Sequence, residues 1–280
     1  MRIKIVSDST CDLSPAQIEQ YQIGIFPLTV IKDGTEYKDG VTITPADIFA
    51  HVAAGGDLCT TSAGNLNDYI EFFAKYSGEY DGVLHISLGS GFSSSYQNAC
   101  LAAGEYDNVR VVDSNNLSTG HGLVVLKACE LAATCESLDA LQQAVADYTG
   151  KIEASFVLDQ LKYMVKGGRC SAAAALGANL LNLKPCIEVK DGKMSVVKKY
   201  RGSYDKCLVN YIKDRLEGRE DLMNDLIFIT YTEVSDATLD TVKQAVDTYG
   251  SFEQVAITTA GCTVSCHCGP ATLGVLFVRK

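Results

Sequence analysis

IKIVSDSTCDLSPAQ, residues 3–17, is the stretch that decides the fold. Ile3–Ser7 alternates in polarity as a buried strand does. Ser14-Pro15 with Gln17 supplies the N-cap, the first-turn proline and the capping-box partner of a short helix. The stretch therefore predicts a strand followed closely by a helix, which is the repeating unit of an open α/β sheet.

The same alternation continues as far as residue 149. Further strands are expected at 23–32, 83–87 and 109–113, and helices at 93–103 and over 120–149. Asp33-Gly34 is a tight turn, and Thr44-Pro45 with Asp47 starts another helix. Strands that alternate with helices predict a parallel sheet with helices on its faces.

The pattern changes near residue 150, after which most of the expected elements are strands. They lie at 154–158, 186–189, 194–200, 226–232, 255–259 and 273–278. Asp191-Gly192 joins two of them as a hairpin, which requires antiparallel pairing. The sequence therefore predicts a two-domain α/β protein, with a parallel-sheet α/β/α domain over residues 1–150 and a mixed or antiparallel α+β domain over residues 151–280.

Composition indicates a folded chain and excludes some classes of partner. Of the 280 residues, 47% are apolar and 21% are charged, and the formal net charge is -10. This charge disfavours a nucleic-acid partner, because binding to nucleic acids needs clustered Lys and Arg. No uncharged apolar run approaches the roughly 20 residues that cross a bilayer, so no integral membrane segment is expected.

The amino terminus and the cysteines favour a cytoplasmic location without a metal. Residues 1–9 have no basic region, apolar core or cleavage site of a signal peptide. The 11 cysteines are odd in number and lie mostly in apolar segments, as buried reduced thiols do. Cys262, Cys266, His267 and Cys268 carry soft metal ligands, but their spacing matches no usual zinc knuckle and no second pair lies nearby. We therefore expect neither a metal nor a cofactor.

Hydroxyl residues gather where the expected parallel strands end. They are Ser7, Ser9 and Thr10 after the first strand, Ser90, Ser93, Ser94 and Ser95 after 83–87, and Ser114 after 109–113. Thr60-Thr61-Ser62 sits in a loop that is able to reach the same edge. Ligands of open α/β sheets bind at this edge, and hydroxyls with free amides at helix starts suit a carboxylate or a phosphate. Each hydroxyl taken alone is also explained as a helix cap.

Two features of the second half are candidate ligand groups. In Gly167-Gly168-Arg169 the two glycines allow backbone conformations that other residues avoid. The arginine carries a permanently charged guanidinium that is able to bind an oxyanion. An ordinary glycine helix terminus with a solvated arginine gives the same pattern. His267 is expected in a loop between strands and not on an apolar core face, which favours a functional role.

Enzymatic interpretations of the same edge are the alternatives. Gly89-x-Gly91-x-x-Ser94 with Asp113 imitates the fingerprint of a nucleotide-dependent enzyme, but it lacks the third glycine and does not follow the first strand. Asp8 is placed as a phosphatase nucleophile would be, without the usual second acid two residues later. Ser93 with His267 would make a Ser/His hydrolase, but no Gly-x-Ser-x-Gly elbow is present.

Six ordered motifs resemble those of the DegV family of fatty-acid-binding proteins, and together they span nearly the whole chain. They are residues 6–13 (VSDSTCDL), Thr61-Ser62, residues 90–97 (SGFSSSYQ), Asp113-Ser114, Gly167-Gly168-Arg169 and His267-x-Gly269-Pro270. The resemblance implies a two-domain α/β protein that encloses a fatty acid at the domain junction. It also implies a binding protein without a catalytic activity of its own.

Site residues follow from this resemblance residue by residue. It implies that Thr61 and Ser93 bind the carboxylate of a long-chain fatty acid, that His267 joins their network and that Arg169 lies beside the headgroup; Ser62 and Ser94 belong to the same motifs. The acyl chain is expected to run into the second domain, along residues 172–183. Some family members are the binding subunits of a bacterial fatty acid kinase, so a separate kinase catalytic protein is a candidate partner.

Overall fold

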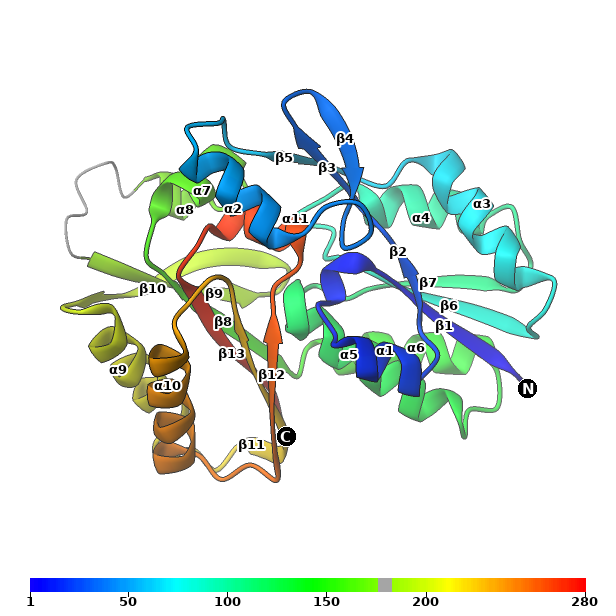
Figure 1. The fold of residues 1–280 in the computed structure, drawn as a ribbon. Coiled ribbons are helices and arrows are strands. Elements are labelled where there is room, and N and C mark those ends of the chain that lie inside the picture. Colours follow the sequence, from blue (N-terminus) through cyan, green and yellow to red (C-terminus); the bar gives the residue numbers. More distant parts are fainter. Residues whose placement is uncertain (176–182) are drawn as a thin grey trace.

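The opening strand joins a four-stranded parallel sheet in the computed structural model, which describes residues 1–175 and 183–280. In spatial order the strands are β2 (Gly24–Phe26), β1 (Ile3–Asp8), β6 (Gly82–Ser87) and β7 (Val109–Asp113). Helices α3 (Leu66–Ser77) and α4 (Ser95–Ala103) cover one face of the sheet, and α1 (Pro15–Gln20), α5 (Ser118–Ala132) and α6 (Leu138–Thr149) cover the other (Figure 1). The predicted parallel sheet is confirmed.

A small antiparallel sheet stands beside the parallel one. It consists of β4 (Thr35–Lys38), β3 (Thr29–Lys32) and β5 (Thr60–Ser62), and α2 (Pro45–Ala53) lies in the connection between β4 and β5. The expected single strand over 23–32 is therefore wrong, because it is divided between two sheets. Pro27 lies at the division, where its missing N–H prevents the ladder from continuing.

The second half of the chain forms a mixed six-stranded sheet. Its strands, in spatial order, are β10 (Lys193–Arg201), β9 (Leu183–Lys190), β8 (Ile152–Leu158), β13 (Thr272–Arg279), β11 (Leu222–Tyr231) and β12 (Gln254–Thr259). Only the β11–β12 pair is parallel. The hairpin at Asp191-Gly192 is confirmed, and both of its residues have positive φ. The expected mixed character of this half is also confirmed.

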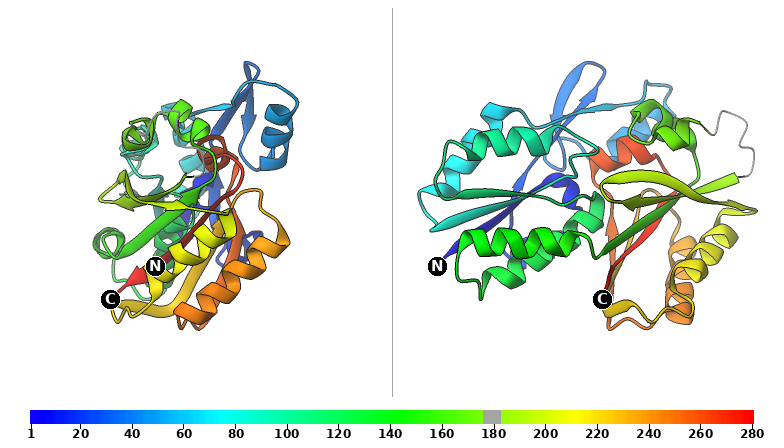
Figure 2. Two further views of the ribbon diagram at one scale, coloured as in Figure 1. Left: turned by 90° about the vertical axis from the view of Figure 1, so that its left-hand side faces the viewer. Right: turned by 180° about the vertical axis from the view of Figure 1, so that it is seen from behind.

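Helices cover both faces of the six-stranded sheet. α9 (Tyr204–Leu216) and α10 (Asp236–Tyr249) pack on one face, as both views in Figure 2 show. The other face meets the start of α5. The short helix α7 (Leu161–Gly167) packs against α11 (Cys262–Cys268), and α8 (Ser171–Ala174) packs against α7 and β10. No helix within residues 1–175 or 183–280 is long and apolar enough to cross a bilayer.

Local capping signals explain where several helices begin. The capping boxes at Ser14 and Thr44 are both formed, as predicted. The expected helical run over 120–149 is instead two helices, and Ser137 caps the second by accepting a hydrogen bond from the Ala140 amide. A 3₁₀ turn, Ser9–Cys11, follows β1 and carries hydroxyl residues past the end of the parallel sheet.

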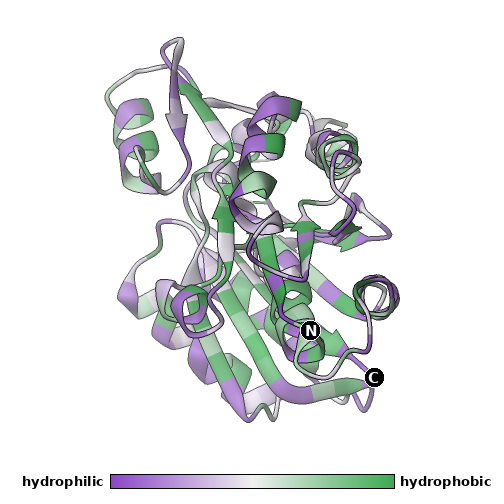
Figure 3. Cartoon of the chain, turned by 90° about the vertical axis from the view of Figure 1, so that its right-hand side faces the viewer, coloured by the Kyte–Doolittle hydropathy of each residue, from purple (hydrophilic) through white to green (hydrophobic). Residues whose placement is uncertain are grey.

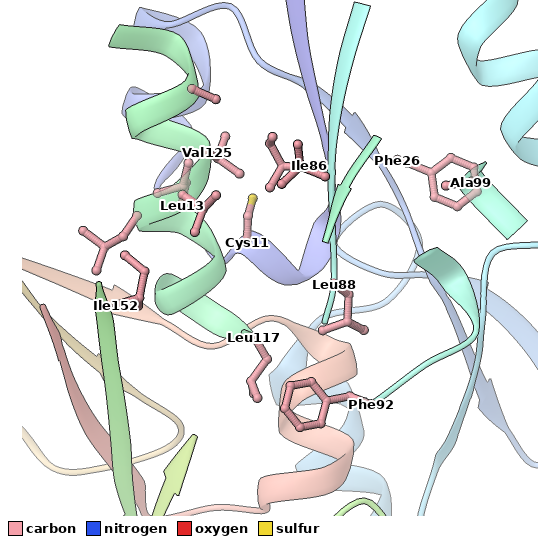
Figure 4. Close-up of a cluster of buried hydrophobic side chains, with 14 of the residues drawn as sticks. Cys11, Leu13, Phe26, Ile86, Leu88, Phe92, Ala99, Leu117, Val125 and Ile152 are labelled. Carbon is pink, nitrogen blue, oxygen red and sulfur yellow. The ribbon is translucent and has the colours of Figure 1, made fainter. Parts of the chain in front are cut away.

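One hydrophobic core continues from the first half of the chain into the second. It includes Ile86 and Val125 beside the parallel sheet, Leu117 at the start of α5, and Ile152 and Leu276 on the six-stranded sheet. Figure 4 shows part of this cluster, and Figure 3 shows hydrophobic residues along the strands with hydrophilic residues on the outer sides of the helices. The junction between the two halves is therefore apolar.

Candidate functional site

A cavity of about 540 Å³ lies at this junction, and we call it the proximal cavity. Its polar lining consists of Thr10, Thr61, Ser62, Ser93, Arg169, Thr263 and His267, and its apolar lining of Leu28, Ala63, Leu88, Phe92, Leu117, Met164, Met194, Val264 and Cys268. None of the described residues that line it is acidic. The cavity is therefore suited to a molecule with an anionic end and an apolar body.

Thr61 and His267 form the first polar pair of the cavity. Thr61 Oγ1 lies 2.8 Å from His267 Nε2. Burial, together with the charge of Arg169, lowers the pKa of His267 to about 4, so the ring is neutral at pH 7. Because Nδ1 has no hydrogen-bond partner among the described residues, we assign the ring proton to Nε2, where Thr61 accepts it. The Thr61 hydroxyl proton is then free for a ligand.

Ser93 is a second residue whose hydroxyl proton is left free for a ligand. Its Oγ accepts a hydrogen bond from the Ser95 amide at 3.1 Å and lies 2.9 Å from Ser95 Oγ. The buried Ser95 hydroxyl also accepts from the Gly64 amide, which connects this turn to the loop after β5. When Ser95 donates to Ser93, the Ser93 proton is available to a ligand. Two hydroxyl donors therefore face the cavity, one from β5 and one from the turn before α4.

Arg169 supplies the positive charge at the mouth. Its Nη1 donates to Gly167 O at 2.7 Å and its Nε to Phe92 O at 3.4 Å, so it joins the two halves of the chain beside Ser93. The two preceding glycines serve different needs. A Cβ at Gly167 would lie 2.2 Å from His267 Nδ1, whereas Gly168 adopts a φ of +68° at the end of α7. The motif thus places both the histidine and the arginine.

The expectation that His267 lies in a loop is wrong, because it belongs to the short helix α11. Asp39, far away in the sequence, explains why this helix forms. Its carboxylate accepts hydrogen bonds from the Cys262 amide at 2.8 Å and the Thr263 amide at 3.1 Å, two donors of the first helical turn. Gly269, with φ of +75°, then ends the helix.

The structure brings five of the six predicted site residues together. Thr61, Ser62, Ser93, Arg169 and His267 line the proximal cavity, whereas Ser94 is exposed and lies outside the lining. Two other rim hydroxyls serve the fold. Ser7 is buried beside His121 at 2.9 Å, and Ser114 is buried and donates to Asn116 O.

The groups that suggested enzymes are engaged in structural bonds. Asp8 is fully buried and accepts from Tyr69 Oη, Ser87 Oγ and the Leu88 amide at 2.6, 2.9 and 2.8 Å. Asp113 accepts from the amides of Ser90 and Asn115, as a turn residue does. Ser93 bonds to Ser95, and His267 to Thr61, so the two do not form a nucleophile–base pair in this arrangement.

The apolar part of the lining was not anticipated from the sequence. Met164 and Met194 come from α7 and β10, and Leu117 and Phe92 lie side by side next to α11 (Figure 4). Each of these residues also fits an ordinary core position. The only sequence signal was Phe92 inside the serine motif, and the others depend on tertiary packing.

Comparison with known proteins agrees with this geometry. The sequence model described as "Uncharacterised protein, DegV family" matches residues 2–280. The chain belongs to the DegV family. A DegV domain-containing protein of Clostridium perfringens is 31% identical over 281 residues, covering 100% of this chain and 99% of the relative.

Solved structures share the fold over nearly the whole chain. A DegV family protein from Thermus thermophilus, described for its fatty acid binding, has a TM-score of 0.89 at 29% identity and covers 100% of both chains. A stearic-acid-binding protein from Eubacterium ventriosum has a TM-score of 0.83 at 25% identity and covers 99% of this chain and 98% of its own. The two-domain α/β fold is thus the DegV fold.

Proposed function

We propose that this chain binds a long-chain fatty acid in the proximal cavity. The observation that carries the proposal is the composition of the cavity wall: hydroxyls, a neutral histidine and an arginine at one end, and apolar side chains over the rest. The Thermus thermophilus protein, described for its fatty acid binding, and the stearic-acid-binding protein from Eubacterium ventriosum support this assignment.

In this proposal the carboxylate accepts hydrogen bonds from Thr61 and Ser93. A carboxylate removed from water needs donors for its lone pairs, and both hydroxyls have protons to give. His267 orients Thr61 from behind, at 2.8 Å. Arg169 adds a positive charge at the mouth, which an anionic headgroup requires in a chain of net charge -10.

The domains contribute different parts of the site. We assign the hydroxyl rim to residues 1–150, which supply Thr61 and Ser93, and the binding of the acyl chain to residues 151–280, which supply Met164, Met194 and Val264. Apolar side chains of the first domain, among them Leu88 and Phe92, complete the wall. The expected wall along residues 172–183 falls mostly outside the described residues, including Leu176, Leu180 and Leu181. The test of the proposal is recovery of a fatty acid from the purified chain at about one per chain.

We further propose that the chain is not an enzyme but presents its fatty acid to a separate kinase. Arg169 supports this, because an exposed cation beside the carboxylate would stabilise the charge of an arriving phosphoryl group. The lipid-loaded chain alone should leave ATP intact, whereas addition of a bacterial fatty acid kinase should yield acyl phosphate. Arg169→Ala should lower acyl phosphate formation more than fatty-acid affinity, and Lys166→Ala, exposed on α7, is the matched control. ATP turnover by the chain alone, or equal losses in both assays, would contradict this role.

A further inference from the structure

Thr263 is a polar side chain of the proximal cavity that the proposed carboxylate site does not use. It lines the cavity and is only 7% exposed, and its Oγ1 atom has no hydrogen-bond partner among the described residues. A threonine in a helix often gives its proton to the carbonyl four residues earlier, but Thr263 lies in the first turn of α11 and has no such helical carbonyl. A buried hydroxyl without a partner is unfavourable, so this one indicates a group of the ligand.

Thr10 stands beside Thr263, because one carboxylate oxygen holds both segments. Asp39 Oδ2 accepts a hydrogen bond from Ser9 Oγ at 3.0 Å and another from the Thr263 amide at 3.1 Å. The 3₁₀ turn that contains Ser9 and Thr10 therefore packs against α11. Thr10 also lines the proximal cavity. Thr10 and Thr263 thus form a second polar group in the wall of the cavity, which we call the threonine pair.

The threonine pair offers both an acceptor and a donor. Burial lowers the pKa of His121 to about 4, so its ring is neutral at pH 7. His121 Nε2 lies 3.0 Å from the Ile86 carbonyl oxygen, which only accepts, so we assign the ring proton to Nε2. Thr10 Oγ1, 3.5 Å from His121 Nδ1, then directs its proton toward that nitrogen and keeps lone pairs for a ligand. Thr263 supplies the free proton.

An alcohol matches the threonine pair, because its oxygen accepts one hydrogen bond and its proton donates another. A carbonyl or ether oxygen would use Thr263 alone, since it has no proton for Thr10. The place of the alcohol along the ligand follows from α11. Thr263 precedes His267 by four residues, so the two side chains lie on one face of the helix, about one turn of 5.4 Å apart. The alcohol is therefore expected close to the carboxylate.

We propose that the cavity selects a long-chain acid with a hydroxyl group on one of the first carbons after its carboxylate, and that Thr10 and Thr263 bind this hydroxyl. The inference rests on the proposed fatty-acid function and narrows the preferred ligand to 2- or 3-hydroxy acids. An acid without the hydroxyl still binds through Thr61 and Ser93, but it leaves Thr263 unpaired.

The test is equilibrium titration of the delipidated full chain with palmitate and with the separate enantiomers of 2- and 3-hydroxypalmitate. A neutral hydrogen bond changes affinity by about twofold to tenfold, so at least one hydroxy enantiomer should bind about threefold to tenfold more tightly than palmitate. Its mirror image should bind less tightly, because only one configuration directs the hydroxyl to the threonine pair. Enantiomers have the same solubility and the same tendency to form micelles, so a difference between them reports on the site.

Thr263→Val should abolish this preference and leave the palmitate affinity within about twofold of wild type, because the Thr263 hydroxyl makes no bond in the palmitate complex. Thr258→Val is the matched control. Thr258 is also 7% exposed, but it bonds to Thr230 and lies outside the lining of the proximal cavity. The control variant should keep the wild-type preference.

Equal binding of palmitate and every hydroxy enantiomer by wild type would overturn the proposal, whether or not the variants fold. Equal losses for palmitate and the hydroxy acids in Thr263→Val would overturn it too, because Thr263 would then bind a water molecule or serve only the fold. Both results leave fatty-acid binding itself intact. Absence of binding by every acid would instead overturn the proposed function.

Discussion

Thr61→Val combined with Ser93→Ala is expected to weaken fatty-acid binding on the order of a hundredfold to ten-thousandfold. Each hydroxyl is placed to donate one hydrogen bond to the carboxylate, and such a bond to a charged group contributes about 1.5–3 kcal/mol, or about tenfold to a hundredfold in affinity. Valine is close in size to threonine but removes the hydroxyl, so the Thr61 change deletes the donor and also leaves the His267 Nε2–H without its acceptor. Titration of the delipidated variant with a fluorescent fatty acid measures the effect.

Ser94→Ala is the matched control for this double variant. Ser94 follows Ser93 directly, is exposed, and makes no capping hydrogen bond at the start of α4. Its replacement should change neither affinity nor melting temperature. Wild-type affinity in the double variant, together with a lowered melting temperature, would show that Thr61 and Ser93 serve only the fold.

Asp8→Ala is expected to destabilise the chain by about 3–5 kcal/mol, the cost of breaking a buried charged network by removing one partner. The carboxylate is fully buried, and its loss leaves Tyr69 Oη, Ser87 Oγ and the Leu88 amide without their acceptor. His85 Nε2, 3.3 Å from Asp8 Oδ1, also loses its partner. Urea unfolding of wild type and variant gives the free energy difference directly.

The same carboxylate gives stability a defined dependence on acid. Burial by itself would raise the pKa of Asp8, but His85, with smaller contributions from His121 and Tyr69, outweighs burial and lowers it from 3.8 to about 2. A carboxyl group whose pKa is lower in the folded chain than in the unfolded chain stabilises the folded state. This stabilisation is complete at pH values above the pKa of the unfolded chain. This contribution is therefore lost as the pH falls from about 4 to about 2, and Asp8→Ala should show a weaker loss over that range.

Asp68→Ala is the control for the stability measurement. Asp68 pairs with Lys38 at 3.4 Å near the surface, where both side chains are substantially exposed. Such pairs contribute about 0–1 kcal/mol. If Asp8→Ala proved no more destabilising than Asp68→Ala, Asp8 would not be a structural residue, and its place at the end of β1 would again suggest a chemical role.

Features that depend on neighbours in sequence were predictable. The capping boxes at Ser14 and Thr44 and the Asp191-Gly192 hairpin are local devices, so their residues reveal them directly. The positions of the rim hydroxyls followed from the alternation of strands and helices, because parallel strands end at one edge of their sheet. Thr61, Ser62, Ser93, Arg169 and His267 were identified through the family motifs, and the fold brings them to one cavity.

Features that depend on distant partners were not predictable. Helix α11 is capped by Asp39, more than 220 residues earlier in the chain, so the segment around His267 resembled a loop. The strand over 23–32 divides at Pro27, and its two parts pair with strands of different sheets that lie far apart in the sequence. Leu117 and Met194 acquire their role only when the two halves of the chain meet. No local pattern distinguishes such residues from ordinary core positions.

The most direct measurement of the central proposal is a denaturing mass spectrum, with organic extraction, of the chain purified without added lipid. A fatty acid enclosed by both domains should survive purification, and we predict a long-chain monocarboxylic acid at about one per chain. The Thr61→Val, Ser93→Ala variant, purified in parallel, should carry much less. Recovery of a nucleotide, or of no lipid even after the delipidated chain is exposed to fatty acids, would contradict fatty-acid binding.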